Sequence, residues 1–335
     1  MYCTANKKML NMLILDILKE YSDEDNRLTQ QRIMRILHDQ YGMECDRRSV
    51  KRNIEALNEL GYEIPYEKGK GYCLISREFD DAELGMLIDS VLFSKTLSKS
   101  QTKSLIEKLK ALGNKHFSAK VSYISNLQEL QHADNKQLMI SLDKINDAIA
   151  DGNKISFVYN EYGTDLKLHP KRDGLEYIVN PYQIVANNGF FYLIGNYDKY
   201  DNIGHYRIDK MAKVEIRKED KVKPKKEVTE FRQGYSLPKH MAEHIYMFSG
   251  LSVRVKFLIN KDMVGTLVDW FGRDFRILEK GEEMITVSVS CNRSAMRYWA
   301  LQYGACVEVL EPVSLREEIR DCICEMKEKY CRESL

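Results

Sequence analysis

Apolar residues recur every three or four positions through the first part of the chain. A period near 3.6 residues predicts amphipathic helices, because it places the apolar side chains on one face. We expect such helices over residues 7–20, 29–42 and 46–61. Thr29 and Asp46 stand where they can cap the second and third helices.

Two short strand-like segments, residues 62–67 and 71–76, follow the third helix. The glycine-rich sequence KGKG lies between them and is typical of a tight turn. Three helices followed by a hairpin is the element order of a winged helix-turn-helix. We therefore predict a winged helix-turn-helix DNA-binding domain over residues 1–78.

The hydrophobic period changes along the rest of the chain. Residues 79–150 carry capped amphipathic patterns and are expected to form a helical connector. From there the period is two, and several short strands predict a small β-barrel over residues 151–220. A charged stretch makes residues 221–249 a linker, and residues 250–335 alternate strands with helices as an α/β extension. The expected fold class is α+β, with several domains.

Composition limits the class of protein. The chain has 335 residues, of which 44% are hydrophobic and 30% are charged. This balance is typical of a globular protein of two or three domains and excludes a disordered, collagen-like or coiled-coil chain. The sequence shows no apolar run of the roughly 18 residues that a membrane span needs, and its start lacks a secretory signal pattern. The eight cysteines form no CxxC pair, so we expect a cytoplasmic protein without a disulfide framework.

A local basic patch lies in the third predicted helix. The formal net charge is only +1, so contact with nucleic acid has to come from such patches. In a helix-turn-helix the third helix enters the major groove, where arginine suits guanine or phosphate and asparagine suits adenine. We expect DNA contacts from this helix and the hairpin tip, through Arg47, Arg48, Ser49, Lys51, Arg52, Asn53, Lys68 and Lys70. The alternative is a merely solvated helix face, since residues 1–80 hold 13 Lys and Arg against 14 Asp and Glu.

The predicted barrel is rich in tyrosine and in basic residues. Aromatic faces and cationic groups together suit the stacking of bases and the pairing of phosphates. Alternation along the strand places His205, Arg207 and Asp209 on one face and Tyr206 on the other. The alternative is equally open: the tyrosines fill the barrel, and Arg207 pairs locally with Asp209 or another carboxylate.

Several motifs of this region, taken in order, closely resemble the WYL domain. The signature triplet is FYL at Phe191–Leu193, with phenylalanine in place of tryptophan. A second block is RIDKM at Arg207–Met211, with lysine in place of an arginine. Tyr159 on the first strand and the dipeptide PY before the triplet also match. With its N-terminal and C-terminal parts included, the chain resembles three-part bacterial WYL transcriptional regulators.

The resemblance implies an Sm-like barrel that acts as a sensor and binds nucleic acid or a nucleotide-like ligand through a basic, aromatic pocket. Positions that match this pocket are Tyr182, Tyr192, Arg207 and Lys210. With the other motif positions and three added from strand phase, the expected effector-binding residues are Tyr159, Lys171, Arg172, Tyr182, Phe191, Tyr192, His205, Arg207 and Lys210. We expect a homodimer, because a dimer lets two recognition helices meet the half-sites of a double-stranded operator. We also expect binding of the effector to change the operator affinity.

The segment His240–His244 reads HMAEH and fits the HxxEH pattern of a metalloprotease. Histidines four apart on a helix can share a zinc ion while the glutamate activates water. We expect no metal site here, because the helix is short and no third ligand on a downstream helix can be named. No catalytic residue and no cofactor are expected either. Two alternatives to the regulator stay open: an accessory protein that binds RNA or single-stranded DNA, and this metalloprotease.

Overall fold

The computed structural model describes residues 7–121, 137–232 and 234–331. The chain divides into two compact units, residues 1–136 and 137–335. None of the described helices is both long and apolar enough to cross a membrane. Seven cysteines carry free thiols, and Cys3 lies outside the described residues.

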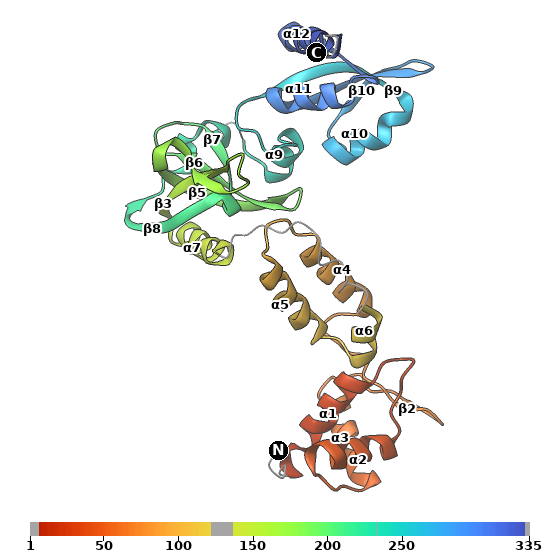
Figure 1. The fold of residues 1–335 in the computed structure, drawn as a ribbon. Coiled ribbons are helices and arrows are strands. Elements are labelled where there is room, and N and C mark those ends of the chain that lie inside the picture. The colour runs from red at the N-terminus through yellow and green to blue at the C-terminus, as the bar shows by residue number, and fades with distance from the viewer. Residues whose placement is uncertain (1–6, 122–136, 233, 332–335) are drawn as a thin grey trace. The chain divides into compact units, whose positions relative to one another are not determined.

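The first unit is helical apart from one small hairpin (Figure 1). In chain order it contains the 3₁₀ helix Lys7–Met9, α1 (Leu10–Tyr21), α2 (Gln30–Tyr41), α3 (Arg47–Glu59), β1 (Tyr66–Glu67), β2 (Gly71–Tyr72), α4 (Asp81–Leu92), α5 (Lys99–Lys110) and α6 (Lys115–Lys120). The three predicted N-terminal helices are present. The hairpin strands are shorter than predicted, because only two residue pairs join them, Tyr66 with Tyr72 and Glu67 with Gly71.

Local capping sets the limits of α2 and α3. Thr29 Oγ1 accepts a hydrogen bond from the amide of Arg32 at 3.2 Å, and Asp46 Oδ1 accepts one from the amide of Ser49 at 2.8 Å. These bonds satisfy N–H groups that have no partner inside the helix. α2 ends at Gly42, which has a left-handed φ of 61° that glycine adopts without a steric penalty.

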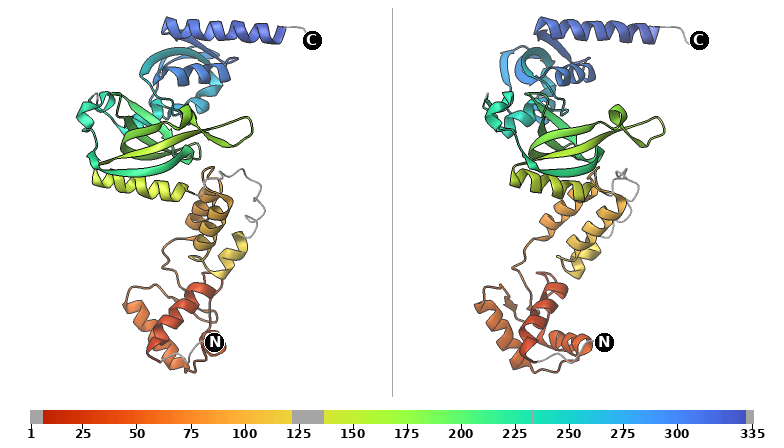
Figure 2. Two further views of the ribbon diagram at one scale, coloured as in Figure 1. Left: turned by 60° about the vertical axis from the view of Figure 1, so that its left-hand side comes forward. Right: turned by 90° about the vertical axis from the view of Figure 1, so that its left-hand side faces the viewer.

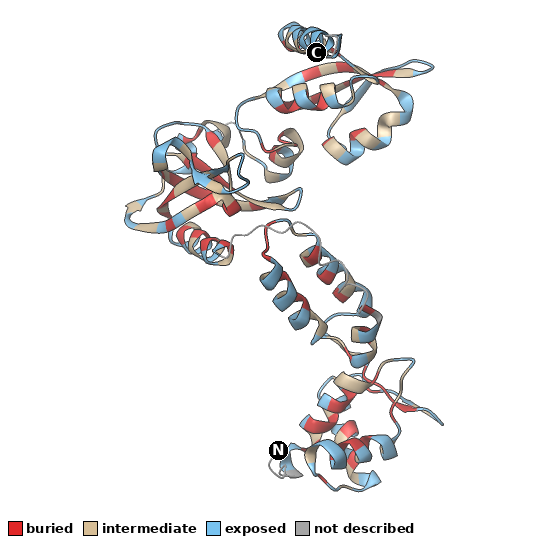
Figure 3. Cartoon of the chain, in the orientation of Figure 1, coloured by how far each residue is buried: buried red, intermediate tan, exposed pale blue. Residues whose placement is uncertain are grey.

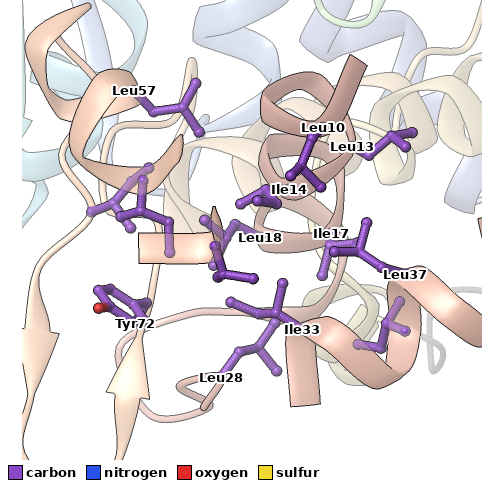
Figure 4. Packing of buried hydrophobic residues seen from close by; sticks show 14 of the residues in the cluster. Leu10, Leu13, Ile14, Ile17, Leu18, Leu28, Ile33, Leu37, Leu57 and Tyr72 are labelled. Carbon is purple, nitrogen blue, oxygen red and sulfur yellow. The ribbon is translucent and has the colours of Figure 1, made fainter. Parts of the chain in front are cut away.

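Helices α1, α2 and α3 bury their apolar faces around one core (Figures 3 and 4). Ile14 and Leu18 of α1, Ile33 of α2 and Ile54 of α3 are all at most 1% exposed, and Tyr72 of β2 joins them. Burying one aliphatic side chain of this size stabilises a fold by about 1.5–3 kcal/mol. The core therefore fixes which face of α3 turns to solvent.

The second unit begins with a helix and a six-stranded sheet. Its elements are α7 (Leu138–Asp151), β3 (Asn153–Tyr162), β4 (Leu168–Pro170), the 3₁₀ segment Lys171–Gly174, β5 (Glu176–Asn187), β6 (Phe190–Tyr197), β7 (Ile203–Arg207), the 3₁₀ helix Ile208–Lys210 and β8 (Met211–Lys221). The strand order is β4-β3-β5-β6-β7, and β8 also pairs with β3. All of these pairs are antiparallel.

The sheet is open, which differs from the predicted closed barrel. Among the described residues β7 and β8 do not pair with each other. β7 has only five residues, and after the 3₁₀ helix Ile208–Lys210 the chain pairs with β3 instead. The strands themselves and the two-residue turn at Asn188–Gly189 are as predicted, since Asn187 lies opposite Phe190 and both turn residues have positive φ.

Helix α7 packs against this sheet, on β3, β5 and β8 (Figure 2). Its buried residues Leu138, Ser141, Ile145 and Ala148 face the strands. The second unit therefore starts at residue 137, whereas the sequence places α7 in a connector that ends at residue 150. An apolar stripe predicts a buried helix face, but it does not say which domain covers that face.

The segment predicted as a linker is packed rather than extended. It contains the 3₁₀ helix Lys225–Glu227, α8 (Thr229–Arg232) and α9 (Leu237–Glu243). Val228 and Met247 of this segment share a buried cluster with Ile194 and other residues of the sheet. The segment thus covers one face of β5, β6 and β7.

A second sheet completes the unit. Its elements are β9 (Ser252–Asn260), the 3₁₀ helix Lys261–Met263, α10 (Val264–Phe271), β10 (Arg276–Lys280), β11 (Met284–Asn292), α11 (Arg293–Gln302), β12 (Val307–Glu311) and α12 (Val313–Cys331). The strand order is β10-β11-β9-β12. Phe257, Phe271 and Trp299 are fully buried between the sheet and its helices. The alternation of strands and helices is as predicted.

Candidate functional site

Helix α3 presents a basic face to solvent. Its residues Val50, Ile54 and Leu57 are buried, so the helical period turns the positions between them outward. The exposed basic side chains in its first two turns are Arg47, Arg48, Lys51 and Arg52. Lys51 Nζ lies 3.6 Å from Glu55 Oε1, an exposed pair that contributes little to stability.

Two other residues of α3 that are expected to contact DNA, Ser49 and Asn53, form hydrogen bonds within the helix and its cap. Asn53 Nδ2 donates a hydrogen bond to the backbone carbonyl of Ser49 at 2.8 Å. The amide of Ser49 in turn donates to the cap residue Asp46. Both Ser49 and Asn53 are half-buried, and their contact with bases stays a prediction.

The hairpin tip lies beside the loop that precedes α2. Leu28 and Tyr72 exchange backbone hydrogen bonds of 2.7 and 2.8 Å, which join β2 to that loop. Gly71 has a φ of 108°, and a Cβ atom there would lie 2.2 Å from the carbonyl oxygen of Leu28. Only glycine fits this approach. The tip carries the exposed lysines Lys68 and Lys70, and Lys70 Nζ lies 2.6 Å from a glutamate of β1.

In the second unit, Arg207 at the end of β7 is held on two sides. Its Nε and Nη2 atoms donate to the carboxylate of Asp209 at 3.1 and 2.7 Å, and its guanidinium carbon lies 3.6 Å from the ring centre of Phe190. Burial lowers the pKa of Arg207, but the hydrogen bonds and the charge of Asp209 outweigh burial and raise it. The side chain is 24% exposed, and Asp209 uses only two of its five N–H donors.

Two tyrosines flank this arginine. The hydroxyl of Tyr159 accepts a hydrogen bond from the backbone amide of Arg207 at 3.1 Å, and burial raises the pKa of Tyr159 to about 12. Tyr192 of β6 lies directly across from Arg207 in the strand register, and burial raises its pKa too. Both hydroxyl groups are therefore neutral at pH 7 and act as hydrogen-bonding groups.

The expected effector-binding set contains three further basic residues besides Arg207 and His205. Lys210 is half-buried and its Nζ lies 5.9 Å from the ring centre of Tyr162. Burial first, and then the charge of Arg207, lowers the pKa of Lys210. Lys171 forms an ion pair with Glu161. Arg172 is exposed and has a left-handed φ of 50°.

Tyr182 and Phe191 lie apart from Arg207. Tyr182 is 8% exposed, and its hydroxyl donates to the backbone carbonyl of Lys223 at 2.9 Å. Phe191 lies opposite Ala186. Successive residues of a strand face opposite sides, so Phe191 faces away from Tyr192 and from Arg207. An effector role for these two residues stays a prediction that their positions do not favour.

Two residues beside Arg207 are absent from the expected set. The ring of Phe190 contacts the guanidinium of Arg207, and the carboxylate of Asp209 accepts two hydrogen bonds from it. Strand alternation could have indicated Phe190, because it lies two residues before Tyr192 on the same face. The sequence analysis named Asp209 only as a possible ion-pair partner of Arg207, and the structure contains that ion pair.

His205 belongs to a different group. Its Nε2 atom lies 2.7 Å from Nε2 of His240, and the rings of His240 and His244 stack at 4.1 Å. Burial, and then the neighbouring histidines, lowers the pKa of His205 and of His240 to about 3. The sequence offered no third partner for His240 and His244 on a downstream helix, and the structure supplies one upstream, on β7.

Comparison with known protein families finds a match for each part of the second unit. Residues 141–216 match the WYL domain, and residues 251–326 match the WCX domain. No curated protein sequence matches the chain.

Among solved structures, the chain is similar to proteasome accessory factor B/C (PafBC) of Arthrobacter aurescens, with 15% identity and a TM-score of 0.31 over 98% of this chain and 50% of that one. It thus spans half the length of PafBC. It is also similar to a CRISPR Cas-related protein, with 17% identity and a TM-score of 0.41 over 100% of this chain and 89% of that one. Within the second unit, residues similar to the WYL domain are thus followed by residues similar to the WCX domain.

Proposed function

We propose that the chain is a transcriptional regulator that binds duplex DNA through its first unit and an anionic, nucleotide-like effector through its WYL domain. The observation that carries the proposal is the exposed basic face at the start of α3, which is rigidly backed by the apolar core of the first unit. The helix order and the hairpin next to it support a winged helix-turn-helix. We assign no catalytic step to the protein.

In this proposal α3 lies in the major groove. Arg48 and Arg52 are four positions apart and share one helix face, so both reach the same stretch of groove. The positive end of the helix dipole at Arg47 adds to the attraction for phosphate. Lys68 and Lys70 at the hairpin tip follow the backbone next to it. A homodimer would place two such helices on half-sites one helical turn apart.

The effector in this proposal binds at Arg207. The N–H donors that Asp209 leaves free suit a phosphate group, while Tyr192 offers a ring on which a base can stack. Arg207 and Asp209 together are neutral, so Lys210 supplies the net positive charge of this site. The proposal is also supported by the match of residues 141–216 to the WYL domain.

Fluorescence anisotropy with labelled DNA tests the proposal. The variant Arg48→Ala/Arg52→Ala should lose duplex affinity, because two phosphate or base contacts disappear. The control Lys103→Ala/Lys108→Ala removes the same charge from exposed positions of α5 and should bind like the wild type. Equal affinity of all three proteins would overturn the DNA-binding assignment. A wild-type preference for single-stranded over duplex DNA would favour the accessory nucleic-acid-binding protein instead.

A further inference from the structure

Three imidazole rings meet beside the sheet of the second unit. His205 comes from β7, His240 lies in α9, and His244 directly follows α9 as its C-cap. One ring nitrogen of each histidine lies within 4.8 Å of the other two. No other three histidine, cysteine or acidic side chains among residues 7–121, 137–232 and 234–331 lie close enough together to hold a metal ion.

The hydrogen bonds of this group leave lone pairs on its nitrogens. His244 Nδ1 lies 2.9 Å from the backbone carbonyl of His240. A carbonyl only accepts, so Nδ1 is the donor when this contact is a hydrogen bond, and Nε2 then holds a lone pair. In many metal sites, a histidine that binds the metal through Nε2 is oriented by a hydrogen bond from its Nδ1–H to a backbone carbonyl. Because this Nδ1 contact of His244 is shorter than the 3.3 Å contact of Nε2 with the carbonyl of Gly250, it favours the tautomer that a metal ligand needs.

His205 offers a lone pair in either tautomer. Its Nε2 atom lies 2.7 Å from Nε2 of His240, and one proton between them makes this contact a hydrogen bond. Its Nδ1 atom is buried and has no hydrogen-bond partner. When Nε2 carries the proton, Nδ1 keeps a lone pair, and when the proton moves to Nδ1, Nε2 gains one.

Two of the three histidines are buried, His205 is half-buried, and among the described residues no hydrogen-bond donor from outside the group faces these lone pairs. His240 and His244 are 6% and 5% exposed. His244 Nε2 lies 3.3 Å from the backbone carbonyl of Gly250, so its lone pair faces another acceptor. Buried polar groups are normally satisfied by a partner, and a cation between the rings would satisfy several at once.

We propose that His205, His240 and His244 bind one divalent transition-metal ion, with zinc as the expected species. Imidazole nitrogens suit Zn²⁺, Co²⁺, Ni²⁺ and Cu²⁺, whereas Mg²⁺ and Ca²⁺ prefer oxygen ligands. Histidines four positions apart form a common zinc-binding pair, and β7 supplies the third ligand. With Zn–N bonds of about 2.0–2.1 Å, tetrahedral ligands lie roughly 3.3 Å apart, so His205 and His240 separate slightly on binding.

The metal at this site has a structural role and does not form a hydrolytic centre. The glutamate of the HxxEH pattern, Glu243, pairs with Lys239 at 3.9 Å and lines a cavity with Arg254 and Ser288, so Lys239 engages the carboxylate that would have to act as base. The metal instead joins α9 to β7, two residues from Arg207. It thereby fixes the segment between the WYL and WCX domains to the strand that carries Arg207.

The test is a titration of untagged, chelator-treated full-length protein with Co²⁺, followed by visible absorption. We expect saturation at one Co²⁺ per chain, strong d–d bands of a four-coordinate ion and no thiolate charge-transfer band. Zn²⁺ should displace the cobalt. His205→Gln and His240→Gln should each lower the affinity at least about tenfold, while the control His169→Gln, an exposed histidine paired with Asp165, should leave it unchanged.

Three results would overturn the site: no metal uptake by folded wild type, a thiolate band, or unchanged affinity in His205→Gln. Circular dichroism shows whether the variants fold. If they do not, X-ray absorption of the wild-type cobalt complex identifies the ligands without any substitution. A first shell with three imidazoles supports the site, and one with sulfur or with oxygen alone contradicts it.

Discussion

Arg207 and Asp209 form a two-point ion pair at the end of β7, in which a carboxylate that is 2% exposed holds a guanidinium that is 24% exposed. The carbon of the same guanidinium lies 3.6 Å from the ring centre of Phe190. Because both contacts fix the plane of the fork, its remaining donors point in a fixed direction, which a lysine could not provide. The pair therefore stabilises this part of the sheet and orients the donors to which the proposed function assigns anion binding.

Asp209→Asn removes the charge of this pair and keeps its size. We expect the free energy of unfolding of the second unit to fall by about 1–3 kcal/mol, because Arg207 loses a charged partner at a largely buried site. The exposed part of Arg207 remains in water, which limits the loss. Urea denaturation measures the change. Asp220→Asn, which breaks the exposed pair with Arg217, should have no measurable effect, and equal losses in both variants would contradict the assignment.

Arg207→Lys tests whether the fork, and not only the charge, binds an anion. We expect this variant to bind a short single-stranded oligonucleotide about tenfold more weakly than the wild type, nearly as weakly as Arg207→Ala, since lysine cannot make two parallel hydrogen bonds. Duplex binding should stay unchanged. Anisotropy measures both. The control is Lys218→Ala, an exposed lysine of β8, and wild-type affinity in Arg207→Lys would argue against phosphate recognition here.

Gly71→Ala should destabilise the first unit by more than about 2 kcal/mol, because the new Cβ would meet the carbonyl of Leu28 at 2.2 Å and the backbone is left-handed. Gly69→Ala is the matched control. Gly69 also has a positive φ, of 88°, but open space around it, so we expect a loss of only about 1 kcal/mol. Thermal denaturation compares the two variants. Similar losses would show that β2 does not approach the loop before α2 so closely.

Acid should destabilise the second unit through His205 and His240. Burial, followed by the neighbouring histidines, lowers their pKa from 6.5 to about 3 in the folded protein. Between these values the unfolded chain binds more protons than the folded one, so stability falls as the pH falls. The melting temperature of chelator-treated protein should drop between pH 7 and pH 5. The drop should be smaller in His205→Gln/His240→Gln, and an equal drop would contradict the burial of these rings.

Structural features that depend only on neighbouring residues in the chain can be predicted from this sequence. The starts of α2 and α3 follow from Thr29 and Asp46, since a cap needs only its own helix. The hairpin turn between β5 and β6 follows from the dipeptide Asn188–Gly189. The buried and exposed positions of α3 follow from its period, which is why its basic face is visible in the sequence.

Features that depend on which elements pack together are harder to predict. Strand register decides that Phe190 and not Phe191 lies beside Arg207, and a shift of one residue would reverse this. Whether the strands close into a barrel depends on pairing between β7 and β8, which the sequence pattern does not encode. The approach of His205 to His240 joins residues 35 positions apart and requires the packing of α9 on the sheet.

The salt dependence of duplex affinity tests the role of α3 most directly. Each phosphate contact adds about 0.9 to the slope of the logarithm of affinity against the logarithm of salt concentration. We predict that Arg48→Ala/Arg52→Ala lowers the wild-type slope by between about 1 and 2, whereas Lys103→Ala/Lys108→Ala leaves it unchanged. Identical slopes for the wild type and both variants would contradict the placement of α3 against the DNA backbone.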